Sequence, residues 1–305
     1  MTAAVIDSSR PGVASALGPA LVDDYLCRLG VPHEPPSPAG LARLHRAHVE
    51  RVPYETFWLH LGEDIGIDPV ASARRIARTR RGGYCFHLNG AFAELLGALG
   101  YCLTRHVAGV HDAAGPSVET LRNHVALVVH DLPSPANLAG DWYVDAGLGD
   151  VLHGPLPLLS GRSRQGPMSF AIETAARDGV GDWHFVNDPR GSLGGVSIVA
   201  EPAAIDVFEE RHAFNVTSPA SSYSRTVTCQ RRHAGGADVL RGRVLVRRDG
   251  ATTTTRTLET LAELLAVLHD VFSMRLDVPR VALARLWTQM CGAHDQWAAR
   301  QAVAS

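Results

Sequence analysis

RRGGYCFHLNG, at residues 80–90, is the segment of this 305-residue sequence with the most distinctive chemistry. Two adjacent glycines release the backbone from its usual limits, and the apolar residues that follow recur with a helical period up to Leu99. The pattern predicts that Cys85 lies at a helix N-terminus, where unpaired N–H groups and the helix dipole favour the thiolate that attacks carbonyls. Cys85 is therefore a candidate nucleophile. The ordinary alternative is a small buried hydrophobic residue, which most free cysteines are.

A nucleophilic thiol needs a base, and the base needs an acid that orients it. His124 opens the valine-rich run HVALVVH, which is typical of a buried strand. Asp145 follows the strand-like WYV at residues 142–144. Adjacent strands would bring the two side chains together, although either residue alone has a common structural role in a core or a turn. Cys85, His124 and Asp145 are the candidate catalytic residues.

The sequence upstream of this segment is mainly helical in pattern. Residues 21–26 and 41–52 predict two helices separated by a proline-rich loop at 32–38, and Asp68 before Pro69 predicts a capped helix start. Residues 1–18 have no apolar period and predict a flexible tail.

The predicted secondary structure changes twice downstream of this segment, first to strands and then to a hairpin followed by helices. Residues 141–144 and 196–200 predict further strands. Segments 242–248 and 252–257 flank Asp249-Gly250, a pattern that predicts a two-residue hairpin turn. Leucines of near-3.6 period from 258 to 268, and the segment 282–302, predict closing helices.

Composition excludes several classes of function. Lys and Arg number 29 against 31 Asp and Glu, so the formal charge of −2 argues against a general nucleic-acid or membrane-surface partner. The sequence has no long apolar span and no signal-peptide pattern, which predicts a cytoplasmic protein. Five cysteines without a Cys-x-x-Cys pair fit neither a disulfide framework nor a zinc ribbon, and we expect no metal.

Two weaker motifs have ordinary explanations. His45 and His48 lie one helical turn apart and suit a metal, but no third ligand is evident. Gly147-Leu148-Gly149 lacks the third glycine of a dinucleotide-binding loop, which argues against a Rossmann domain.

The sequence resembles the arylamine N-acetyltransferase family. The similarity rests on an Arg-Gly-Gly-x-Cys segment with an asparagine four residues after the cysteine, on a histidine that opens an apolar strand, and on a Val-Asp-x-Gly-x-Gly segment. The matching residues are Arg81, Gly82, Gly83, Cys85, Asn89, His124 and Asp145. The segments at 44–55 and 155–158 are also similar to the family's.

This resemblance implies an α+β multi-domain fold with a cysteine-protease-like Cys-His-Asp triad. A helical N-terminal bundle at 19–105 would carry the cysteine, a middle β-barrel domain at 106–215 would carry the histidine and aspartate, and an α/β lid would follow at 216–305. The three styles of sequence pattern agree with this division.

The resemblance also implies a function and a set of residues. The enzyme would move an acetyl group from acetyl-CoA, as co-substrate, to an arylamine or hydrazine by a ping-pong mechanism through acetyl-cysteine. The implied roles are catalytic for Cys85, His124 and Asp145, substrate-binding for Gly147, Leu148 and Gly149, and structural support for Arg81 paired with Glu55.

Three departures from the family pattern bear on substrate choice and on the thiol. His87 replaces a usual Glu and puts a titratable group beside Cys85. Leu148 replaces a common Phe, and Asp150 replaces a common Gly. An amide synthase that uses a larger acyl group, a thiol hydrolase, and a non-catalytic CoA- or amine-binding protein remain alternatives.

Overall fold

The structure is a computed structural model that describes residues 12–175 and 179–304. Residues 1–11 of the predicted tail lie outside the described residues. The remainder of that segment is held to the fold, because the Val13 N–H donates to the Leu103 carbonyl at 2.9 Å and the Ala16 N–H donates to Glu94 Oε2 at 2.7 Å.

The N-terminal third of the chain is helical, as its pattern predicts. Its elements are α1 (Pro19–Leu29), α2 (Pro38–Arg51), the short β1 (Tyr54–Glu55) and α3 (Phe57–His60), α4 (Pro69–Thr79) and α5 (Cys85–Ala98). Proline occupies the first turn of α1, α2 and α4, and the Asp68 carboxylate caps α4 by accepting from the Ala71 N–H at 2.6 Å. Helix α5 is buried along most of its length, so the segment that carries Cys85 lies in the core.

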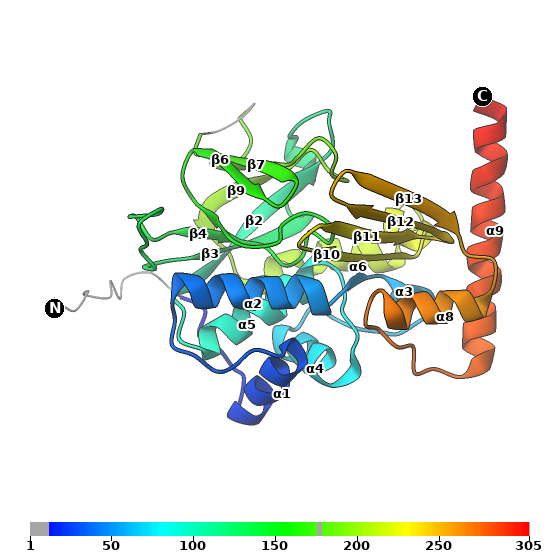
Figure 1. The fold of residues 1–305 in the computed structure, drawn as a ribbon, viewed down its shortest axis with the longest axis horizontal. Helices are drawn as coiled ribbons and strands as arrows, with labels where there is room; N and C mark the ends of the chain where they lie inside the picture. The colour runs from blue at the N-terminus through cyan, green and yellow to red at the C-terminus, as the bar shows by residue number, and fades with distance from the viewer. Residues whose placement is uncertain (1–11, 176–178, 305) are drawn as a thin grey trace.

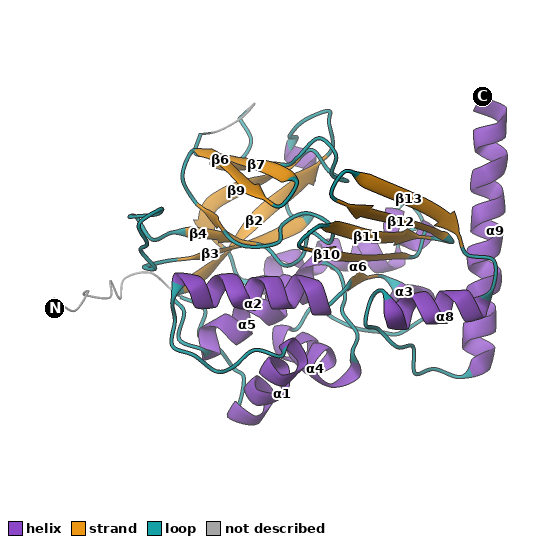
Figure 2. Ribbon diagram, in the orientation of Figure 1, coloured by secondary structure: helices purple, strands orange, loops and turns teal. Residues whose placement is uncertain are grey.

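Eight antiparallel strands form the middle of the molecule in the order β5-β4-β3-β2-β9-β8-β7-β6 and curve into a near-closed barrel (Figure 1). These strands are β2 (Leu103–His111), β3 (His124–Val129), β4 (Trp142–Val144), β5 (Leu156–Pro157), β6 (Gly161–Gln165), β7 (Met168–Glu173), β8 (Trp183–Val186) and β9 (Gly195–Pro202). Figure 2 shows the N-terminal helices gathered along one side of this sheet. Every residue of β3 is buried, as expected for a strand of continuous apolar sequence.

The C-terminal region combines a second sheet with helices. The sheet has the order β1-β10-β11-β12-β13, so the N-terminal β1 pairs with the C-terminal β10. Its strands are β10 (Thr228–His233), β11 (Gly236–Arg241), β12 (Val244–Asp249) and β13 (Thr252–Thr257), and its helices are α6 (Glu209–Thr217), α7 (Ser222–Arg225), α8 (Leu261–Asp270) and α9 (Arg280–Ala304). Two short 3₁₀ helices, at Val118–Thr120 and Ile205–Phe208, complete the elements.

This architecture confirms the predicted α+β fold of helices, barrel and C-terminal sheet with helices. The proposed domain limits stay a prediction: the limit at 105/106 falls inside β2, and that at 215/216 falls inside α6. The hairpin is present, but its turn lies one residue later than predicted. Asp249 still pairs with Thr252 in the strand ladder, so the two loop residues are Gly250 and Ala251.

Candidate active site

The structure brings the three predicted catalytic residues together from three elements. Cys85 is the first residue of α5, His124 is the first residue of β3, and Asp145 follows β4 directly. Because β3 and β4 pair side by side, His124 Nε2 and Asp145 Oδ2 lie 2.6 Å apart, and both side chains are buried. The Cys85 Sγ lies 3.7 Å from the Asn123 carbonyl, next to His124 in the chain, and both Cys85 and His124 line one cavity.

The histidine is held in its charged form. Burial by itself would lower the pKa of His124, but the charge and the hydrogen bond of Asp145, together with a hydrogen bond and the charge of Cys85, raise that pKa to about 10. An imidazolium beside the thiol stabilises a thiolate. The site therefore supplies a cationic partner in addition to the helix N-terminus at Cys85.

The Asp145 carboxylate accepts four hydrogen bonds. Its Oδ2 accepts from His124 and from the Tyr143 hydroxyl at 2.8 Å, and its Oδ1 accepts from Asn89 Nδ2 at 2.8 Å and from the Gly147 N–H at 2.9 Å. Burial would raise the pKa of Asp145, but the charge of His124 and these bonds hold it below its ordinary value. A buried carboxylate with every oxygen satisfied stays ionised and fixes the orientation of its histidine.

Asn89 and Tyr143 are site residues whose roles the sequence did not show. Asn89 lies one turn after Cys85 on α5, where its Nδ2 also donates to the Val125 carbonyl at 2.7 Å and its Oδ1 accepts from the Ala146 N–H at 2.8 Å. This one side chain therefore joins the helix of the thiol to β3 and to the loop of Asp145. Asn89 was part of the matched motif, but its partners are 36 and 57 residues away in the chain.

The cavity at the thiol has a volume of about 460 Å³. Gly147 and Leu148 of the predicted substrate-binding set line it, and Gly149 does not. A Cβ at Gly147 would lie 2.8 Å from the Cys85 Cα, so only glycine permits this close approach. Gly149 instead has φ +67°, a conformation that favours glycine, and packs against Gln230, which lines the cavity.

The predicted pair of Arg81 and Glu55 is part of a larger buried network. Arg81 Nε donates to Glu55 Oε1 at 3.0 Å, and Arg81 Nη1 donates to Glu63 Oε1 at 2.9 Å. Arg75 binds both carboxylates and also donates to the Gly82 carbonyl at 3.2 Å. The network thus reaches Gly82, in the segment that precedes Cys85, which is compatible with a supporting role for Arg81 and Glu55.

The other sequence candidates have structural partners. His87 Nδ1 accepts from the Tyr84 N–H at 3.3 Å, and burial, with the charges of His212 and Arg75, lowers its pKa to about 3, so it caps α5 as a neutral group. His45 contacts the Asp145 carbonyl through Nε2 at 3.0 Å, and His48 contacts the Tyr25 hydroxyl at 2.8 Å. Burial lowers the pKa of His45 to about 4 and that of His48 to about 3.

Within the described ranges, no group of three or more His, Cys, Asp or Glu side chains is placed to hold a metal ion. Among the helices that the structure describes, none combines the length and apolar character needed to cross a membrane. The cytoplasmic location stays a prediction from composition.

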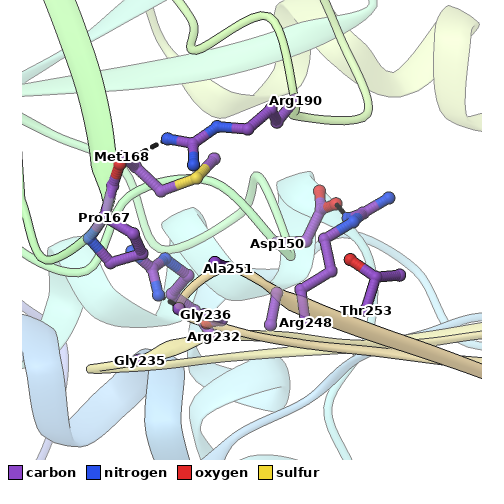
Figure 3. Close-up of a pocket in the computed structure, with 12 residues that line it drawn as sticks. Asp150, Pro167, Met168, Arg190, Arg232, Gly235, Gly236, Arg248, Ala251 and Thr253 are labelled. Atoms are coloured by element: carbon purple, nitrogen blue, oxygen red, sulfur yellow. Dashed lines mark hydrogen bonds and ion pairs between the residues drawn. The ribbon is translucent and has the colours of Figure 1, made fainter.

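A second cavity, of about 280 Å³, lies between the barrel and the tips of the C-terminal hairpins (Figure 3). Three arginines line it, and each is already bonded. Arg248 Nη1 contacts Asp150 Oδ2 at 3.1 Å, and Arg190 binds the Asp188 carboxylate and the Pro167 carbonyl. The fully buried Arg232 donates to the carbonyls of Val151, Gln165, His233 and Gly236.

A thiol at a helix start beside a histidine and a buried aspartate is the arrangement that enzymes with a cysteine nucleophile use for acyl transfer. Comparison with known proteins agrees. The family model described as N-acetyltransferase matches residues 39–281. The chain therefore belongs to the arylamine N-acetyltransferase family, whose members are acyltransferases, and the predicted family is confirmed.

Three relatives illustrate the similarity. The pineal gland isozyme NAT-3 of Gallus gallus is 30% identical over 151 residues, which are 47% of this chain and 49% of that protein, so the match spans about half of that relative's length. The solved arylamine N-acetyltransferase of Nocardia farcinica is 29% identical with a TM-score of 0.74, over 87% of this chain and 93% of that one. The Mycobacterium marinum enzyme in complex with CoA is 22% identical with a TM-score of 0.76, over 88% and 98% of the two chains, and shows the same fold.

Proposed function

We propose that the protein transfers an acetyl group from acetyl-CoA to the nitrogen of an arylamine or hydrazine, through an acetyl thioester on Cys85. The observation that carries this proposal is the buried contact of 2.6 Å between His124 and Asp145 in the site whose cavity also exposes the thiol. Family membership supplies the reaction class, and the geometry supports the roles of these residues.

In the first half-reaction, the Cys85 thiolate attacks the thioester carbonyl of acetyl-CoA. A bond forms between Cys85 Sγ and the carbonyl carbon, and the bond to the CoA sulfur then breaks. CoA leaves with the proton of the His124 imidazolium, which makes His124 neutral. The Cys85 N–H, at the start of α5, would stabilise the oxyanion of the intermediate.

In the second half-reaction, the amine nitrogen attacks the acetyl carbon while neutral His124 accepts its proton. The amide forms, the bond to Cys85 Sγ breaks, and the thiolate and imidazolium are restored. Asp145 holds the tautomer of His124 in one step and offsets its charge in the other. Two half-reactions at one thiol predict ping-pong kinetics.

The charge around the thiol cavity supports an anionic donor. Arg211, Arg225 and Arg241 line it, and no acidic side chain does. None of these three arginines forms an ion pair with Asp or Glu within the part of the chain that the structure describes. Unpaired guanidinium groups suit the phosphates of CoA, and the similar Mycobacterium marinum enzyme was solved with CoA.

The walls of the cavity suit an aromatic acceptor. Phe214 is 41% exposed, although it is a large apolar side chain, and it lines the cavity with Val110, Leu148 and Leu193. Apolar walls with a few polar groups are usual for small-molecule sites. We assign Gly147 and Leu148 to the acceptor side, Gly149 to the turn behind them, and Arg81 with Glu55 to support of the thiol segment.

The test is the intact mass of the protein after brief exposure to acetyl-CoA without an amine. We expect a gain of one acetyl group, its loss when an arylamine is added, and no gain in Cys85→Ala. Cys27→Ala is the matched control, because Cys27 is an exposed free thiol outside the cavity. An acetyl gain that survives in Cys85→Ala contradicts the proposal.

The same assay separates the alternatives. Release of CoA without an amine and without a lasting mass gain indicates a hydrolase, and binding of CoA without either indicates a non-catalytic protein. Leu148, which lines the cavity in place of a bulkier Phe, favours an amide synthase as the second candidate function. In that case, a larger acyl-CoA would acylate Cys85 faster than acetyl-CoA.

A further inference from the structure

Two tyrosine hydroxyls meet inside the thiol cavity. Tyr54 comes from β1 and Tyr223 from α7, 169 residues apart, and the Tyr54 hydroxyl donates to the Tyr223 hydroxyl at an O–O distance of 3.1 Å. Both side chains line the cavity that contains Cys85 and His124. Neither residue has a part in the mechanism described above.

Tyr223 is fixed in position by its surroundings. Its N–H donates to the Ser221 hydroxyl at 3.2 Å, and its carbonyl oxygen is 3.0 Å from His60 Nε2. Its ring lies edge-on to the ring of Tyr84, with centroids 5.3 Å apart, and Tyr84 is the residue before Cys85. The hydroxyl is therefore held at a defined place in the cavity.

The bond from Tyr54 leaves the hydrogen of Tyr223 available. A phenol donates one hydrogen bond, and among the described residues Tyr223 has an acceptor role toward Tyr54 but no acceptor for its own O–H. Burial raises the pKa of both phenols, followed by the charge of Tyr223 for Tyr54 and by the charge of Cys85 for Tyr223, so both stay protonated donors at neutral pH. A hydroxyl that accepts one bond becomes a stronger donor of the next.

We propose that Tyr223, polarised by Tyr54, donates a hydrogen bond to an oxygen substituent of the acceptor amine and so selects arylamines that carry a phenol, alkoxy or carboxyl group. The inference rests on the proposed function and adds the class of acceptor. The arginines are assigned to the donor phosphates, and the N–H at the start of α5 to the oxyanion. Tyr223 is an aromatic lining residue with a hydroxyl hydrogen left to donate, which suits an acceptor that is itself an aromatic ring with an oxygen substituent.

The experiment compares matched acceptors that differ by one oxygen, namely methoxyaniline and ethylaniline, in their ortho, meta and para forms. The quantity measured is the ratio of kcat/KM for the two members of each pair. We expect the wild type to prefer methoxyaniline in one or more positions, and Tyr223→Phe to lower that preference by about threefold to tenfold, the value of one neutral hydrogen bond. Tyr54→Phe lowers it less, because the donor remains and only its polarisation is lost.

Tyr101→Phe is the matched control, since its hydroxyl contacts Ser37 and does not line the cavity. The methoxyaniline-to-ethylaniline ratio of kcat/KM is compared between the wild type and each variant. The two amines differ in basicity by the same amount for every protein, so that difference cancels. Acetyl-enzyme formation is measured alongside by intact mass. If the wild type forms no acetyl-enzyme, the proposed function fails. If it does, and its ratios equal those of Tyr223→Phe, only the assignment of Tyr223 is overturned.

Discussion

The two arginine-lined cavities of this enzyme hold the same kind of charge for different purposes. In the second cavity (Figure 3), Asp150, Asp188 and backbone carbonyls neutralise or bind every arginine, and the bonds of Arg248 and Arg232 tie the barrel region to the C-terminal sheet. In the thiol cavity, the three arginines lack acidic partners among the described residues. Arginines with carboxylate partners or several carbonyl partners indicate a structural joint. Arg211 donates only to the Glu119 carbonyl, at 3.4 Å, and under the proposed function the arginines without acidic partners are available to an anionic substrate.

The largest effect is expected from Asp145, which contacts the His124 of the thiol cavity. Asp145→Asn removes the charge that keeps His124 cationic and disturbs its tautomer, so we expect acetyl-enzyme formation to slow by about 10³- to 10⁴-fold. Rapid-quench mass spectrometry measures this rate. Asp188→Asn makes the same change beside the second cavity and should alter the rate less than about twofold. Equal rates of acetyl-enzyme formation in the two variants would contradict the claim that only the thiol cavity takes part in the reaction.

The second cavity should instead govern stability. Arg232→Met removes a guanidinium that donates to barrel carbonyls, including Val151, and to the sheet carbonyl of Gly236. Buried carbonyls without donors cost about 1–3 kcal/mol each, so we expect unfolding in urea to show a loss of about 2–4 kcal/mol. The KM for acetyl-CoA of the folded variant should be unchanged. A raised KM in a stable Arg232→Met protein would make this cavity part of the donor site.

The contacts in both cavities also show which features of the structure could be predicted from the sequence and which could not. Helix starts, buried strands and the matched motif depend on neighbouring residues, and they predicted the helices, the strands of His124 and Asp145, and the triad itself. The four donors to Asp145, the Arg75–Glu63 contact and the Tyr54–Tyr223 pair depend on chain segments that only tertiary packing brings together. The predicted domain limits cut β2 and α6 for a related reason, because a change of composition does not mark where a strand or helix ends.

A smaller effect should follow from the unpaired arginines. Arg241→Gln is expected to raise the KM for acetyl-CoA by about twofold to tenfold, the range for an exposed charge pair. Acetyl-pantetheine, which has no CoA phosphates, should show no such change. Arg190→Gln in the second cavity is the control and should leave both values as they are. An equal loss with acetyl-pantetheine would assign Arg241 a role other than phosphate binding.

The last comparison concerns the pH dependence of stability. His124 has a pKa raised to about 10 in the folded protein, against about 6.5 when unfolded. Its contact with Asp145 therefore stabilises the fold fully below about pH 6.5 and is lost as the pH rises toward 10.

We expect the Tm to fall by about 7–14 °C between pH 7 and 10, because a pKa displaced from about 6.5 to about 10 corresponds to about 3–4 kcal/mol over that range. Calorimetry of the wild type and of His124→Gln at matched pH isolates the contribution of this one residue, because other groups titrate equally in both. Parallel curves would mean that the charge of His124 does not stabilise the site. A steeper fall in the wild type would show that loss of the His124 charge at alkaline pH destabilises the protein.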